Sequence, residues 1–192
     1  MKIDKKLNLA FPVQSKDGET WIYSTPIALE TFKRYHMVIA DAHAKIFGKG
    51  LKFAAMSGWR IAAMTIENIA IEDGTWEGQF GVQHGLMNEI VRRTNAFVPT
   101  PNGWSLIPLE DAINHKYLSE EDKDEVMNAI CFFTLVSSME NQKMVQSFWG
   151  WISERWGGRL DASNCTEFQS SLPTLTATAN TGVMAAGSSL PS

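Results

Sequence analysis

The chain is poor in cysteine, has no basic patch and contains no long apolar run. Its 192 residues include two cysteines, Cys131 and Cys165, without CxxC spacing. Two cysteines do not make a disulfide framework, so a reducing compartment is expected. The net charge of −4 and the scattered basic residues argue against nucleic acid as a partner. No segment approaches the ~18 apolar residues of a transmembrane helix, so no membrane partner is expected.

The first residues carry positive charge, but no apolar stretch follows them. This pattern does not predict a secretory signal. A soluble, cytoplasmic protein is expected. Large side chains are plentiful, since seven tryptophans and ten phenylalanines accompany an apolar fraction of 44%. A chain of this length and composition suits one domain with a sizeable core.

The periodicity of the apolar residues favours helices after a short β-hairpin. Alternation over residues 7–11, a turn signal at 16–18 and strand-forming residues at 20–23 predict the hairpin. Helices are predicted near residues 26–47, 53–71, 82–94, 108–113, 119–139 and 143–156, with 99–103 as a loop. The clearest helical stripe steps by three and four residues through Ala28, Phe32, Tyr35, Ile39, Ala42 and Ile46.

Composition changes abruptly at residue 161. From there to residue 192, serine, threonine, alanine and glycine dominate, and so few large apolar groups do not offset the entropy of ordering a chain. The sequence therefore predicts a mainly α fold: a compact helical domain with an N-terminal β-hairpin over residues 1–160, and a flexible C-terminal tail over 161–192. Within the tail, Thr166, Glu167 and Phe168 form a candidate docking element for a partner.

No residue pattern points to catalysis. The acidic pairs lie at predicted helix ends, where they favour the helix dipole, and no nucleophile elbow or phosphate-binding glycine loop is present. His36, Asp41 and His43 make the best enzyme hypothesis, although their spacing fits no known metal motif. The chain is therefore predicted to be non-enzymatic, with no cofactor and no metal. Trp151, which falls off the apolar face of the last helix, is a candidate partner contact.

Several segments in order resemble the tail assembly chaperones of long-tailed (siphovirus-type) bacteriophages. They are WIYSTPI at 21–27, FxxY at 32–35, GLMNEIVRRT at 85–94, NAICFFT at 128–134 and NCTEFQSSL at 164–172. The resemblance implies a non-enzymatic protein that binds the phage tape measure protein and promotes polymerisation of the tail tube protein around it.

The resemblance further implies a protein of the host cell cytoplasm that is absent from the mature virion. Many such chaperones also have a longer form made by ribosomal frameshifting. The alternative hypothesis is a structural virion protein, either a tail completion or a head-tail connector subunit. Self-association into a homo-oligomer stays open in both cases.

Overall fold

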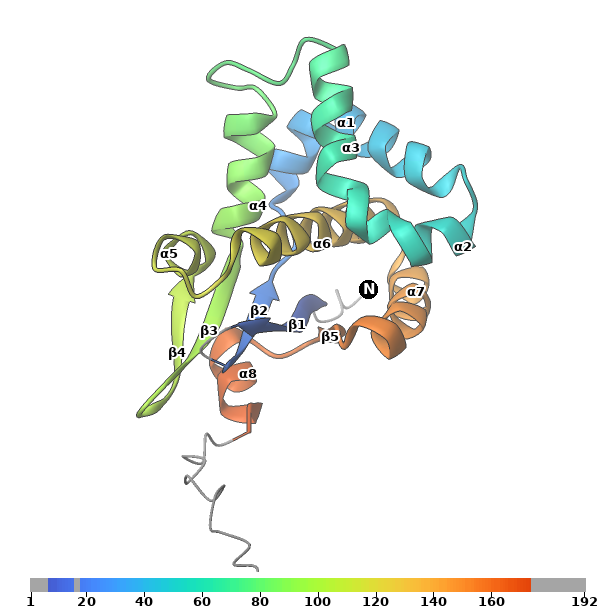
Figure 1. Cartoon of the computed structure of the whole chain (residues 1–192). Helices are drawn as coiled ribbons and strands as arrows, with labels where there is room; N and C mark the ends of the chain where they lie inside the picture. Colours follow the sequence, from blue (N-terminus) through green and yellow to red (C-terminus); the bar gives the residue numbers. More distant parts are fainter. Residues whose placement is uncertain (1–6, 16–17, 174–192) are drawn as a thin grey trace, which may run out of the picture.

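A five-stranded antiparallel sheet forms one layer of the described part of the chain (Figure 1). The computed structural model describes residues 7–15 and 18–173, without the side chains of residues 15, 151, 152 and 154–156. The strand order is β4-β3-β2-β1-β5. The strands are β1 (Asn8–Ser15), β2 (Gly18–Ser24), β3 (Thr94–Thr100), β4 (Gly103–Pro108) and β5 (Arg159–Asp161).

The two faces of the sheet carry separate apolar clusters, because successive side chains of a strand point to opposite faces. On one face, Phe11, Ile22 and Ala96 are opposite one another in the strand register, and all three are buried against the helices. On the other face, Tyr23 and Phe97 are fully buried in a smaller cluster.

Helix α6 (Glu120–Met139) is the central element of the helical layer, and it contacts β1, α1 and α3. All its residues from 129 to 136 are buried, as expected of a helix covered on every side. Its start follows the sequence prediction: the Ser119 side chain accepts a hydrogen bond from the Asp122 amide in a capping box.

Helices α1, α3, α4 and α7 contact α6, whereas α8 lies on the other side of the sheet (Figure 1). Two π-helical segments adjoin these helices: η1 lies between α2 and α3, and η2 directly precedes α4. The elements are α1 (Leu29–Phe47), α2 (Leu51–Phe53), η1 (Ala54–Gly58), α3 (Trp59–Glu72), η2 (Gln83–Met87), α4 (Asn88–Arg92), α5 (Leu109–Asn114), α7 (Gln142–Trp156) and α8 (Cys165–Ser171). None of the described helices is both long enough and apolar enough to cross a bilayer.

The predicted mainly α fold class is wrong, because the structure is mixed α/β. The N-terminal hairpin is confirmed as β1 and β2, but it is part of a larger sheet. The segment predicted as a loop at 99–103 is the tip of the β3–β4 hairpin. Pro99 is compatible with a strand there, because the pairing of β3 with β2 ends at Phe97.

The flexible tail predicted from residue 161 does not begin there. Strand β5 pairs with β1 through residues 159–161, and α8 follows it on the second face of the sheet, where Phe168 and Leu172 are buried. Residues 174–192, the rest of the predicted tail, lie outside the described residues. The predicted boundary at 160/161 falls within strand β5.

Candidate functional site

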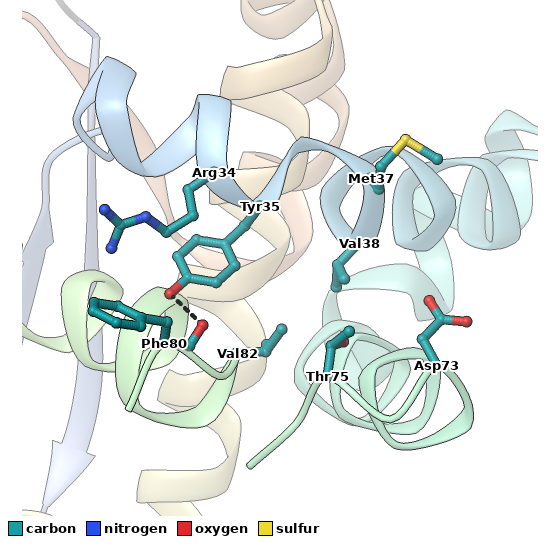
Figure 2. A pocket seen from close by; sticks show the side chains of 8 residues that line it. All are labelled: Arg34, Tyr35, Met37, Val38, Asp73, Thr75, Phe80 and Val82. Carbon is teal, nitrogen blue, oxygen red and sulfur yellow. Dashed lines mark hydrogen bonds between the residues drawn. The ribbon is translucent and has the colours of Figure 1, made fainter. Parts of the chain in front are cut away.

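A pocket of about 550 Å³ lies between α1 and the segment that joins α3 to η2 (Figure 2). Its size is within the ~300–1,000 Å³ range of ligand pockets. Four of its residues come from one and a half turns of α1, and four come from the joining segment. The lining residues are Arg34, Tyr35, Met37, Val38, Asp73, Thr75, Phe80 and Val82.

The joining segment, residues 73–82, is held in place by its own backbone hydrogen bonds. The Thr75 amide donates to the Ala70 carbonyl at 2.7 Å, and the Val82 amide donates to the Thr75 carbonyl at 2.9 Å. Gly74 and Gly78 have φ angles of 65° and 98°, a left-handed conformation that glycine adopts without strain. The wall of the pocket is therefore a structured loop.

Tyr35 connects α1 to the joining segment by a hydrogen bond. Its hydroxyl donates a hydrogen bond to the Phe80 carbonyl at 3.0 Å, drawn as a dashed line in Figure 2. Tyr35 also has non-helical backbone angles, φ −110° and ψ 16°, which mark a kink in α1. The hydroxyl lies over Gly85 of η2, where a β-carbon would overlap it. The kink, the hydroxyl and the glycine together determine how closely α1 approaches η2.

The rim of the pocket is apolar and exposed. The side chain of Met37 is 61% exposed and that of Phe80 is 68% exposed, whereas Val38 and Val82 in the floor are buried. The Arg34 guanidinium lies 5.3 Å from the centre of the Phe80 ring, within cation–π range. Exposed aromatic and methionine side chains around an apolar floor are typical of surfaces that contact another protein.

The predicted partner-binding residues lie away from this pocket. Phe168 is fully buried under the second face of the sheet, and its ring centre lies 5.0 Å from that of Tyr23. Thr166 is exposed, and Glu167 forms a capping box with Asn164 at the start of α8. Phe168 is thus a core residue. Trp151 is in α7, and its side chain lies outside the described residues.

The structure separates the three residues of the enzyme hypothesis. His36 is exposed, and its Nδ1 contacts the Lys33 carbonyl of its own helix at 3.1 Å. Asp41 is exposed. His43 is partly buried, with its Nε2 near Glu140, and it stacks on Phe47 with ring centres 4.2 Å apart. Among residues 7–15 and 18–173, no group of three or more His, Cys, Asp and Glu side chains is arranged to hold a metal ion.

His43 gives the folded state a pH dependence. Burial lowers its pKa from 6.5, although Glu140 opposes the shift, with its Oε1 3.1 Å from the His43 Nε2 in a contact that is not aligned as a hydrogen bond. As the pH falls through 6.5, the unfolded chain binds a proton before the folded chain does. Stability is therefore fully present above 6.5 and falls as the pH drops toward the lowered pKa.

We expect His43→Gln to flatten this dependence. Urea unfolding at pH 7.5 and 5.5 should show a smaller loss of unfolding free energy in the variant than in the natural protein. His36→Gln is the matched control, because His36 is exposed in the folded chain as in the unfolded one. Equal acid-side losses in the natural protein and His43→Gln would contradict the assignment.

Sequence reasoning missed the residues of the pocket rim. Phe80 lies between Gly78 and Gly81 in a segment for which the sequence predicts no helix or strand, and Met37 falls outside the apolar stripe of its helix. The available signal was a second large aromatic residue, after Trp76, in a short glycine-rich loop. Comparison of the chain with known protein families, with curated proteins and with solved structures found no match.

Proposed function

We propose that this protein is a tail assembly chaperone of a long-tailed bacteriophage, and that it binds an apolar segment of a client protein at the pocket between α1 and residues 73–82. The clients are the tape measure protein and the tail tube protein. The chaperone acts in the host cell cytoplasm and leaves before the virion is mature. It works through contact surfaces and without a cofactor.

The observation that carries the binding proposal is the exposed apolar rim of the pocket. An isolated exposed apolar residue is ordinary on a protein surface, but here Met37 and Phe80 flank the same pocket and are each more than 60% exposed. Covering them with a client removes apolar surface from water, which favours association. The identity of the clients is supported by the family resemblance of the five sequence segments.

Phe80→Asp is expected to weaken client binding by about ten-fold or more, because burying a phenylalanine contributes about 1.5–3 kcal/mol. The measurement is co-expression with the tape measure protein, followed by the amount of soluble client and of co-purified complex. The natural chain should keep the client soluble, and Phe80→Asp should not.

Leu106→Asp is the matched control for this experiment. Leu106 is also an exposed apolar residue, 41% exposed, but it lies on the edge strand β4. The Leu106→Asp variant should bind the client as the natural chain does. An unchanged client solubility with the natural chain would refute the chaperone proposal. Stoichiometric recovery of the chain from purified virions would refute it too, and would favour a structural virion protein.

A further inference from the structure

The walls of the pocket restrict the conformation of what can bind there. A peptide that adds to a sheet needs a free strand edge with unpaired backbone groups. Here the walls are α1 and a loop, residues 73–82, that contains no strand, and the amides at both ends of the loop already donate to backbone carbonyls, as Thr75 does to Ala70 and Val82 does to Thr75. The pocket therefore offers no strand edge to a bound segment, whereas a helix satisfies its own backbone hydrogen bonds.

Two charges of opposite sign stand on opposite sides of the pocket. Figure 2 shows Arg34 beside Phe80 and Asp73 at the far side, beyond Val38 and Thr75. Both side chains are exposed. None of the ion pairs among the described residues includes Arg34 or Asp73. Each charge is therefore free to pair with a charge on a bound molecule.

The other charges near Arg34 do not cancel this polarity. A hollow of about 300 Å³ adjoins the pocket at Arg34 and contains Glu30, Glu89, Arg92 and His84. Glu89 is engaged by two arginines of its own helical turn, at 2.8 Å from Arg93 and 3.5 Å from Arg92. Glu30 lies one turn before Arg34 on α1 but forms no ion pair with it among the described residues.

We infer that the pocket takes an amphipathic helix of the client whose apolar ridge lies between an acidic and a basic side chain. The ridge packs on Met37, Val38 and Phe80, the carboxylate pairs with Arg34, and the basic group pairs with Asp73. This inference rests on the proposed function, since it assumes a protein client at this pocket. It adds the chemistry by which one client segment is selected over others.

Synthetic helical peptides test the charge pattern directly. Each has about 18 residues, long enough to form some helix alone, with the same leucine ridge. Their flanking charges are one glutamate and one lysine, two lysines, or two glutamates. One set places the charges seven residues apart and a second set eleven, which is about 10 or 16 Å along a helix. Fluorescence anisotropy with the full chain gives each dissociation constant.

The natural protein is expected to bind the mixed-charge peptide about ten-fold more tightly than the other two, because each of them replaces one attraction by a repulsion. Arg34→Glu should prefer the two-lysine peptide, and Asp73→Lys should prefer the two-glutamate peptide. The double variant should prefer the mixed-charge peptide again. Arg60→Glu, which changes another exposed arginine on α3, should behave as the natural protein does.

The outcomes separate this inference from the proposed function. The inferred charge selection is overturned if the natural protein and each variant bind the three peptides equally. It is also overturned if the natural protein binds none of the peptides. The proposed function stands or falls separately, on whether the tape measure protein co-purifies with the chain and is lost in Phe80→Asp.

Discussion

Replacing Gly85 by alanine is expected to lower the free energy of unfolding by about 3 kcal/mol or more, although alanine is favoured over glycine within a helix by about 1 kcal/mol. The reason is the approach of α1 to η2. A β-carbon at position 85 overlaps the Tyr35 hydroxyl. Tyr35 is 7% exposed and held by its bond to the Phe80 carbonyl, so its ring has little room to move.

Two further variants isolate this clash. Gly150→Ala in α7 should be neutral or stabilising by up to about 1 kcal/mol, because its β-carbon meets no atom of the described residues within 4 Å. In a Tyr35→Leu background, Gly85→Ala should lower the free energy of unfolding much less than in the natural protein. The reason is that substitutions of two residues in contact do not have additive effects on stability. Thermal unfolding is measured for Gly85→Ala, Gly150→Ala, Tyr35→Leu and the double variant, with a shift of about 6–12 °C expected for Gly85→Ala. Additive effects of the two changes would contradict the proposed contact.

The regular elements of the fold were the most predictable. The apolar stripe correctly predicted α1, in which Tyr35, Ile39, Ala42 and Ile46 are buried. The helix predicted at 119–139 matches α6, which starts after its cap Ser119. These signals are local, because both the helical period and the capping box are contained in a few consecutive residues. The β1–β2 hairpin was predicted for the same reason.

The rest of the sheet depends on contacts that a local pattern does not contain. Strand β3 pairs with β2 from about 70 residues away, with Ala96 opposite Ile22. Pro99 in the strand and Pro101 just after it indicate a loop when the segment is considered alone. The pocket also depends on contacts between segments that are distant in the sequence. It lies where α1, kinked at Tyr35, meets residues 73–82, and neither segment predicts the other. The exposed Phe80 indicates a binding surface only once Met37 is found at the same pocket.

Helix α8 shows how one side chain can order a polar segment. The composition after residue 161 predicts flexibility, yet Phe168 enters a cluster with Tyr23 and Phe97 on the second face of the sheet. The Gln169 side chain donates to the Trp104 carbonyl at 2.7 Å. An average over composition gives little weight to a single buried ring, whereas the burial of one phenylalanine contributes about 1.5–3 kcal/mol.

Phe168→Ala is therefore expected to cost about 3–5 kcal/mol, as a cavity in an aromatic cluster does, or to release α8 from the sheet. Hydrogen exchange should report faster exchange of the α8 amides, and limited proteolysis should cut between residues 162 and 173. Thr166→Ala is the matched control, because Thr166 is exposed on the same helix, and such changes usually stay within about 0.5 kcal/mol.

The same variant distinguishes the two roles that can be assigned to Phe168. A docking residue would lose client binding on substitution and leave stability unchanged, because its ring would be exposed until a partner covered it. Substitution of a core residue lowers stability and leaves client binding unchanged. Phe168 is fully buried, and it lies on the face of the sheet opposite the cluster that contains Tyr35 and Val38. Phe168→Ala should thus keep its affinity for a client at temperatures where the helical layer stays folded, and Phe80→Asp should lose it without loss of stability.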